Sequence, residues 1–138
     1  MSPSSTFVFD TNALISAALL KNTTSARAYD HALRIGKVAY SETLLAEFAE
    51  VILRKKFDRY FKTMNERLEP IRKLEAKGFK FKPLEKITAS TDPDDNMVLE
   101  LAVAAKAACI ISGDPHLLTL HPFHGIPIIN AATFLSSF

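Results

Sequence analysis

The chain has 138 residues, of which 48% are hydrophobic, and a formal net charge of +2. This size and composition predict one domain with a real core over residues 1–138. No apolar stretch approaches the roughly 18 residues that a membrane span needs, and no basic region followed by a long apolar segment marks a signal peptide. The single cysteine, Cys109, cannot form an internal disulfide, so we expect a soluble cytoplasmic protein.

Basic residues are concentrated in one segment of the chain. Residues 51–86 contain 12 of the 17 Lys and Arg residues and five acids, whereas residues 87–138 contain one basic residue and five acids. A charged helical stretch of this kind can simply be a solvated face. The same asymmetry also suits a phosphate-bearing polymer that lies across one side of the molecule.

Strand and helix patterns alternate along the chain. The predicted strands are TFVF (6–9), KVAY (37–40), ACIIS (108–112) and IPII (126–129). The predicted helices cover 13–20, 25–35, 42 to about 54 behind an N-cap at Ser41, a basic segment 57–77, 93–106, and a short stretch after a cap at Asn130. This alternation predicts an α/β fold, a three-layer α/β/α sandwich with a central, mostly parallel sheet.

Two acids follow predicted strands. Asp10 comes directly after TFVF, and Asp114 comes two residues after ACIIS. Each acid alone is typical of a helix cap or a turn. Ligands of an open parallel sheet, however, bind outside the carboxyl ends of its strands, and adjacent strands would bring these two acids together. They are therefore candidate site residues.

A third candidate acid lies on the helix predicted after Ser41. Apolar residues form a stripe at helical spacing on this helix: Leu44, Leu45, Phe48, Val51 and Ile52. At about 100° per residue, Glu47 falls beside the stripe and Glu50 falls nearly opposite it. Glu47 therefore points to the boundary of the sheet, either as a rim carboxylate that reaches water or as part of a site.

The stretch TDPDDN (91–96) places three acids in front of an apolar helix. Asp92 before Pro93 predicts an N-cap with proline in the first helical position. Asp94 and Asp95 follow in the first turn, where the helix dipole favours negative charge. Capping accounts for Asp92, but it does not require two further adjacent acids.

Four segments together resemble the PIN-domain nucleases in order, spacing and strand context: FDTNALIS (9–16), SETLLAEFAEVI (41–52), DPDDNMVLELAVAA (92–105) and IISGDPHLL (110–118). The likeness is closest to the VapC-like toxins of prokaryotic toxin–antitoxin pairs. It implies an acidic quartet that binds metal and carries out catalysis: Asp10, Glu47, Asp95 and Asp114. It also implies polar neighbours that orient the acids or a metal-bound water: Thr11, Asn12 and Ser112. One departure is His116, where many relatives carry another Asp, and this leaves the number of bound metals open.

The resemblance implies a metal-dependent endoribonuclease that cleaves phosphodiester bonds of single-stranded RNA. Crowded carboxylates cannot all ionise without cost unless a hard cation is bound, and Mg²⁺ and Mn²⁺ prefer oxygen ligands. Such a metal would polarise the phosphate and activate the attacking water. We expect other phosphates of the RNA to contact four basic residues: Arg54, Lys55, Lys56 and Arg59. The likeness further implies a cognate antitoxin and a homodimer.

Two other functions remain open at the level of the sequence. One is a non-catalytic module with a PIN-like fold that binds nucleic acid or a protein partner. The other is a phosphatase of the haloacid dehalogenase type, which needs a second Asp where Asn12 stands. Metal-dependent cleavage of single-stranded RNA separates the nuclease from both. The histidines of PHLLTLHPFHG (115–125) have no recognisable zinc spacing and are interpreted as loop residues.

Overall fold

A computed structural model describes residues 5–138 and contains one five-stranded sheet. The strands are β1 (Thr6–Phe9), β2 (Lys37–Tyr40), β3 (Phe79–Lys80), β4 (Cys109–Ile111) and β5 (Ile128–Ile129). The helices are α1 (Thr11–Leu19), α2 (Thr24–Ile35), α3 (Glu42–Ile52), the 3₁₀ helix η1 (Lys55–Tyr60), α4 (Met64–Lys77), α5 (Pro93–Ala105), α6 (Pro115–Leu118) and α7 (Ala131–Ser137). None of the helices in this described part is long and apolar enough to cross a membrane.

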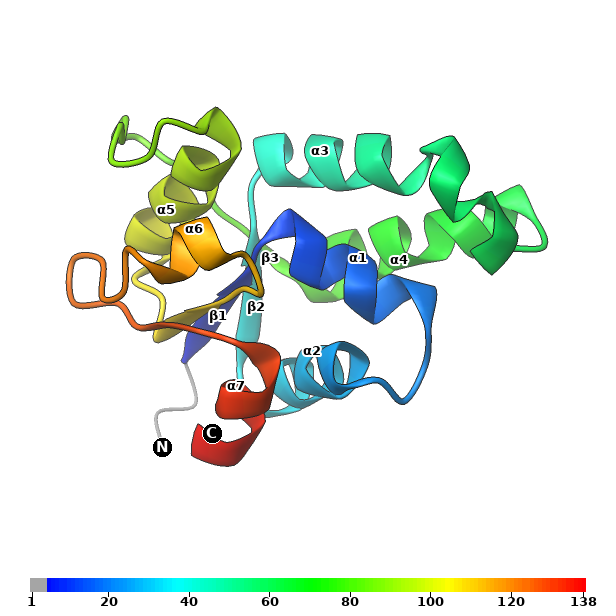
Figure 1. The fold of residues 1–138 in the computed structure, drawn as a ribbon, viewed down its shortest axis with the longest axis horizontal. Coiled ribbons are helices and arrows are strands. Elements are labelled where there is room, and N and C mark those ends of the chain that lie inside the picture. The colour runs from blue at the N-terminus through cyan, green and yellow to red at the C-terminus, as the bar shows by residue number, and fades with distance from the viewer. Residues whose placement is uncertain (1–4) are drawn as a thin grey trace.

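The sheet has the order β3-β2-β1-β4-β5, and all four pairings are parallel. Figure 1 shows α1 to α4 on one side of the strands and α5 and α6 on the other. The predicted three-layer sandwich is therefore confirmed. Because the chain leaves the carboxyl ends of β1 and β4 at the same edge, residues after these two strands become neighbours.

The core is centred on β1, where both faces of the strand are covered. Phe7, Val8 and Phe9 are all buried, as expected for a strand of a parallel sheet with helices on both sides. The ring of Phe7 packs edge-on against Phe134 of α7, with 5.1 Å between centroids, and Phe9 packs against Tyr29 of α2 at 5.4 Å. These contacts fix the carboxyl end of β1 within the sheet.

Side-chain caps define where several helices begin. The Ser41 hydroxyl accepts a hydrogen bond from the backbone N–H of Leu44, and the Asn130 side chain accepts one from Thr133. The Asp92 carboxylate likewise accepts from Asp94 at the start of α5. All three caps agree with the prediction, because capping depends on residues only two or three positions apart.

The prediction of one continuous helical segment over 57–77 was wrong. The chain forms η1, passes through Phe61 and Lys62, and begins α4 behind Thr63. The Thr63 hydroxyl accepts from the N–H of Glu66, whose carboxylate in turn accepts from the N–H of Lys62. This reciprocal pattern resembles a capping box, which starts a new helix and ends the previous one. The sequence analysis also missed β3, a two-residue edge strand with both side chains exposed.

Arg67 of α4 holds α3 and η1 in place. It is only 8% exposed, and its Nε donates to the Ile52 carbonyl at 2.7 Å. Its two terminal nitrogens donate to the Asp58 carboxylate at 2.6 Å and to the Arg54 carbonyl at 2.7 Å. One guanidinium group therefore satisfies the last carbonyl of α3, where no intrahelical donor remains, and also holds the start of η1.

Replacing Arg67 with Met should lower the free energy of unfolding by roughly 2–4 kcal/mol, because hydrogen bonds from a charged donor contribute about 1.5–3 kcal/mol each. Urea denaturation measures this change. The control is Arg72→Met on the same helix, which removes an exposed arginine and should change stability by less than about 0.5 kcal/mol. Equal effects of the two substitutions would contradict the role assigned to Arg67.

Candidate functional site

Asp10 joins β1, β4 and α1 at the carboxyl edge of the sheet. The pairing of Phe9 with Ile111 places Asp10 beside Ser112. One carboxylate oxygen of Asp10 accepts from the N–H of Ala13 at 2.7 Å and caps α1, while the other accepts from the Ser112 hydroxyl. Asp10 is only 6% exposed. Its position and orientation are therefore fixed by three different elements.

The surroundings of Asp10 make its ionised form costly. Burial is the largest effect and raises the pKa of Asp10, although the hydrogen bonds from Ser112 and Ala13 lower it. The negative charges of Asp114 and Asp95 raise it further. Acids from β1, α5 and the end of β4 thus act on one another through space, as expected for carboxylates that share one site.

Asp95 lies in the first turn of α5 but does not serve as its cap. It is 7% exposed, and its carboxylate accepts from the Ser90 hydroxyl at 3.1 Å. Burial raises the pKa of Asp95, the Ser90 hydrogen bond lowers it, and the charge of Asp114 raises it again. Asp92 takes the capping role, so the division between these two acids inferred from TDPDDN agrees with the structure.

Ser90 was not identified by the sequence analysis. In addition to its bond to Asp95, its backbone N–H donates to the Asn96 side chain at 2.8 Å, and its carbonyl accepts from the same amide at 2.8 Å. These bonds hold the loop before α5 against the first turn of the helix. The signal in the sequence was weak, because a Ser near a turn of Asp and Pro residues is common.

Glu47 of α3 lies at the boundary of the core, and Glu50 is exposed, as the helical spacing predicted. The Thr11 hydroxyl donates to Glu47 at 3.0 Å and joins the start of α1 to α3. Burial raises the pKa of Glu47, the Thr11 hydrogen bond lowers it, and neighbouring Asp94 raises it by charge and by hydrogen bonding. The acid next to Glu47 is therefore Asp94, which the sequence analysis had interpreted only as a first-turn residue.

Asp114 completes the acidic quartet. Its backbone N–H donates to the Ser112 hydroxyl at 3.0 Å, and its carboxylate accepts from the N–H of His116 at 2.9 Å. Ser112 thus contacts Asp10 and Asp114 at once. Of the three supporting polar residues, Thr11 and Ser112 hold acids, whereas Asn12 is exposed and makes no side-chain hydrogen bond within residues 5–138.

The acids form an electrostatic cluster rather than a closed ligand cage. Within residues 5–138, no three His, Cys, Asp or Glu side chains are gathered closely enough to hold a metal ion. Two neighbouring groups exist instead: Asp10, Asp95 and Asp114 interact with one another, and Glu47 lies beside Asp94. Their chemistry fits a hard divalent cation, because they offer anionic oxygen donors whose desolvation is unfavourable.

Of the loop histidines, His121 accepts a hydrogen bond from the N–H of Ile128 at 2.8 Å.

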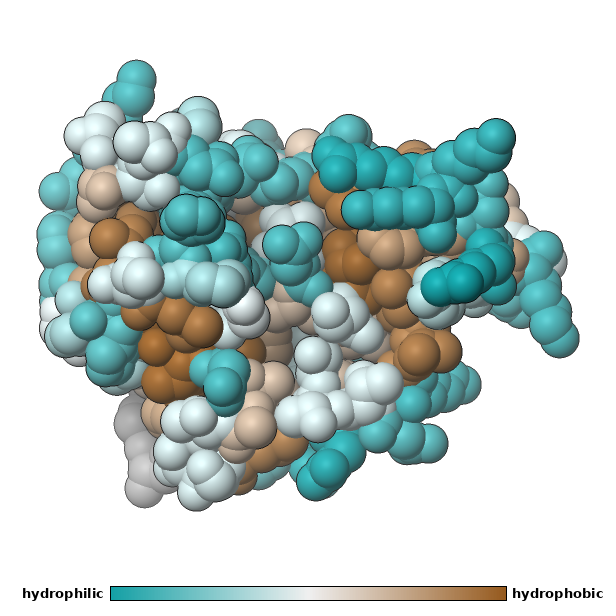
Figure 2. Space-filling model, in the orientation of Figure 1, coloured by the Kyte–Doolittle hydropathy of each residue, from teal (hydrophilic) through white to brown (hydrophobic). Residues whose placement is uncertain are grey.

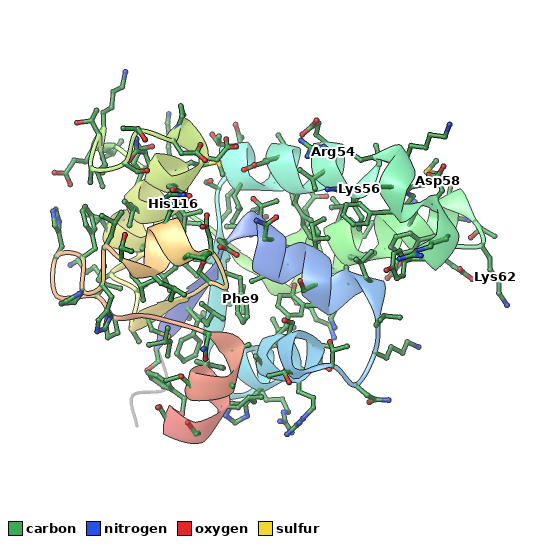
Figure 3. The ribbon with its side chains drawn as sticks, viewed as in Figure 1. Phe9, Arg54, Lys56, Asp58, Lys62 and His116 are labelled. Atoms are coloured by element: carbon green, nitrogen blue, oxygen red, sulfur yellow. The ribbon has the colours of Figure 1, made fainter. Side chains whose placement is uncertain are left out.

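The four predicted RNA-binding residues lie on and just before η1, where all four are exposed: Arg54, Lys55, Lys56 and Arg59. Figure 3 shows Arg54 and Lys56 toward one end of the molecule, away from His116. Arg54 forms an ion pair with Glu50 at 3.2 Å, and Arg59 donates to the Tyr60 hydroxyl. Neither Lys55 nor Lys56 forms an ion pair with another described residue.

The fold and site define an α/β protein whose acids collect at the carboxyl edge of a parallel sheet. Residues 6–116 match the family model of the PIN domain. The chain therefore belongs to the PIN-domain family, as the four sequence segments had indicated. No curated protein is similar enough to count as a match.

Three solved structures share this fold at low sequence identity. VapBC2 from Rickettsia felis, solved bound to a DNA fragment from their promoter, has a TM-score of 0.62 and 11% identity over 91% of this chain and 98% of its own. PAE2754 from Pyrobaculum aerophilum has a TM-score of 0.59 and 13% identity over 99% and 92%. FitAcB from Neisseria gonorrhoeae has a TM-score of 0.55 and 17% identity over 91% and 98%.

Replacing Asp10 with Asn should make the metal-free protein more stable at neutral pH. Because the folded-state pKa of Asp10 is raised, its ionised form destabilises the fold above that pKa, and this penalty disappears as the pH falls toward the unfolded value of about 4. The amide can still accept from Ala13 and donate to Ser112. Melting temperatures in chelator at pH 7.5 and pH 4 test this, with exposed Glu85→Gln as the control. A lower melting temperature at pH 7.5 would contradict the buried-charge interpretation.

Proposed function

We propose that this PIN-domain protein is a metal-dependent endoribonuclease that cleaves single-stranded RNA. The observation that carries the proposal is the mutual interaction of Asp10, Asp95 and Asp114 from three different elements at one edge of the sheet. A non-catalytic binding module would not need the buried acids Asp10 and Asp95 with their raised pKa values. A phosphatase of the haloacid dehalogenase type is less suited, because Asn12 stands where its second Asp is required.

Mg²⁺ or Mn²⁺ would be held by carboxylates of the acidic quartet, with Asp94 available beside Glu47. When bound, such an ion polarises a phosphodiester and lowers the pKa of the attacking water. The residues of this chain keep the acids in position: Ser112 donates to Asp10, and Ser90 donates to Asp95. Exposed His116 leaves one carboxylate fewer beside Asp114 than in many relatives.

We further propose that the exposed basic residues around η1 bind phosphates of the RNA away from the cut. From Glu47, α3 continues for five residues to Ile52, about 7.5 Å along the helix, and Arg54 follows two residues later. A strand of RNA that crosses the acids can therefore also reach the start of the basic segment. Of the four predicted RNA-binding residues, Lys55, Lys56 and Arg59 are the best placed, since none of these three is neutralised by an ion pair to a described residue.

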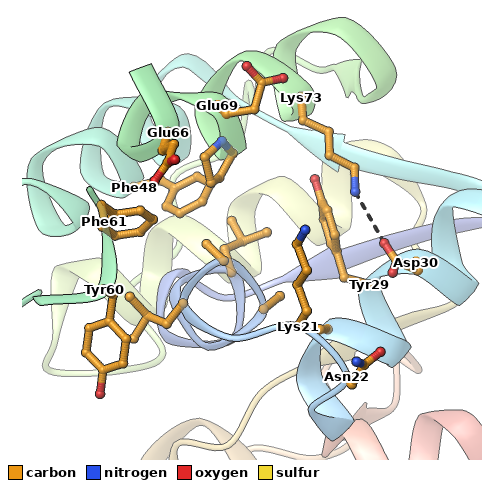
Figure 4. A pocket seen from close by; sticks show the side chains of 16 residues that line it. Lys21, Asn22, Tyr29, Asp30, Phe48, Tyr60, Phe61, Glu66, Glu69 and Lys73 are labelled. Atoms are coloured by element: carbon orange, nitrogen blue, oxygen red, sulfur yellow. Dashed lines mark hydrogen bonds and ion pairs between the residues drawn. The ribbon is translucent and has the colours of Figure 1, made fainter. Parts of the chain in front are cut away.

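We also propose that the protein is the toxin of a toxin–antitoxin pair and forms a homodimer, which sedimentation at micromolar concentration tests. A groove of about 670 Å³ between α1, α2, α3 and α4 is a suitable seat for the antitoxin. Figure 4 shows Phe48 and Phe61 in this groove together with charged Lys21 and Lys73, and Figure 2 shows apolar atoms around α1 beside hydrophilic ones. The lining also carries the acids Asp30, Glu66 and Glu69, and Lys73 forms an ion pair with Asp30 at 3.2 Å, so the apolar side chains rather than a net charge would hold the antitoxin.

Mg²⁺ or Mn²⁺ should raise the melting temperature of the protein, because a cation that binds only the folded state stabilises it by mass action. At a concentration of 100 times the dissociation constant, the gain is about 2.7 kcal/mol. The double substitution Asp10→Asn with Asp95→Asn should abolish the shift, measured by thermal denaturation with and without metal. An equal shift in the double variant would place the metal elsewhere.

Substitutions of acidic and of basic residues should have different effects on the binding and the cleavage of one single-stranded RNA. Asp95→Asn should leave binding nearly intact while cleavage falls by about 100-fold or more, since the acid acts in the chemical step. Lys55→Gln should weaken binding and reduce the slope of log affinity against log salt by about 0.7, the value for one phosphate contact on a single strand. Turnover at saturating RNA should survive this second substitution.

The matched controls are Asp92→Asn, which keeps the cap of α5 because Asn caps about as well as Asp, and Lys106→Gln outside the basic segment. Binding and cleavage are measured for all four variants and the wild type at two salt concentrations. If Asp95→Asn cleaves as well as the wild type, the acids are not catalytic and the binding-module function is preferred. An unchanged salt slope for Lys55→Gln would mean that the basic segment is only a solvated face.

A further inference from the structure

A second hollow lies directly beside Asp114 on the side of α1, α2 and α7. Its volume is about 630 Å³, which is within the range of small-molecule sites. Its polar wall is formed by Asn12, Ser16, Ser25 and Asn130. The hollow is separate from the apolar groove between α1 and α4, and of the acidic quartet Asp114 lines it.

Most of the hydrogen-bonding groups on this polar wall are unused by the fold. Asn12, Ser16 and Ser25 make no side-chain hydrogen bonds with other described residues. Asn130 uses its side-chain oxygen to cap α7 at 2.8 Å, so its NH₂ group remains available. Free amide and hydroxyl groups offer both donors and acceptors to a ligand.

The charge and size of the lining restrict what can bind. Among the described residues that line the hollow, Asp114 is the only charged one, so a phosphate has no basic partner in this lining. The remaining wall is made of small residues such as Ala13, Ala131 and Ala132. At Gly113 an added Cβ would meet no heavy atom within 4 Å, which confirms open space next to Asp114. A neutral, planar group with hydrogen-bonding edges fits this environment.

We propose that the hollow binds the base and ribose of the nucleotide next to the phosphate that the acidic quartet cleaves. This inference rests on the proposed nuclease function, and it assigns nucleotide selection to Asn12, Ser16, Ser25 and Asn130. Unpaired bases of single-stranded RNA expose hydrogen-bonding edges, and the 2′-hydroxyl both donates and accepts. Amide and hydroxyl side chains can satisfy these groups without adding charge. Affinity from this hollow should therefore be independent of salt.

The test uses Ser25→Leu, which fills the hollow from α2, and Thr24→Leu, which adds the same side chain at the exposed preceding residue. Binding of four tetranucleotides, one for each base, is measured at two salt concentrations. The wild type should prefer one of them. Ser25→Leu should weaken that RNA about tenfold, which corresponds to about 1.4 kcal/mol, and should reduce the preference without changing the salt slope. Thr24→Leu should behave as the wild type.

Equal affinity of the wild type for all four RNAs would overturn the proposal, and so would identical behaviour of Ser25→Leu and Thr24→Leu. A reduced salt slope in Ser25→Leu would assign the hollow to phosphate instead. Ala132→Leu fills the same hollow from an exposed position of α7 and replaces Ser25→Leu if that variant does not fold. Base-selective binding without metal-dependent cleavage would refute the proposed nuclease function but support nucleotide binding in the hollow. Metal-dependent cleavage with the same base preference in the wild type and in the variants that fill the hollow would refute only the role of the hollow.

Discussion

The site depends on one buried carboxylate that connects three elements. Asp10 accepts from the N–H of Ala13 and from the Ser112 hydroxyl, so it caps α1 and also joins the ends of β1 and β4. These strand ends are adjacent because Phe9 and Ile111 are paired in a parallel ladder. Without this carboxylate, α1 would lose its side-chain cap and the Ser112 hydroxyl would lose its acceptor.

The acids are held by neutral donors rather than by cations. Thr11, Ser90 and Ser112 donate to Glu47, Asp95 and Asp10, and none of the ion pairs formed within residues 5–138 includes a member of the acidic quartet. Hydroxyl groups orient carboxylates without neutralising them. Negative charge is thereby kept at the carboxyl edge, whereas the basic residues gather around η1. Such a separation suits a ligand that carries both bound cations and phosphates.

The basic segment is positioned by tertiary contacts as firmly as the acids are. Arg67 fixes the end of α3 and the Asp58 carboxylate through three bonds, so η1 keeps a defined place although all its side chains are at least partly exposed. Figure 3 shows Asp58 and Lys62 at this same end of the molecule. The described surface thus has three separate features: the acidic edge, the basic end and the groove along α1.

Local patterns in the sequence determined the strands at 6–9 and 37–40, and a strand at Cys109–Ile111 within the predicted 108–112. They also determined the caps at Ser41, Asp92 and Asn130 and the inward side of Glu47, because each depends on residues a few positions apart. The four candidate acids were named from the resemblance to PIN-domain nucleases, and the chain does match the PIN-domain family model. The break before Thr63 and the hydrogen bond of Ser90 to Asp95 depend on residues a few positions apart, but the sequence analysis missed both. Tertiary structure alone decided the edge strand β3 and the partnership of Glu47 with Asp94. These features depend on which elements the parallel sheet brings together, and spacing along one helix or strand carries no information about a neighbour from a distant element.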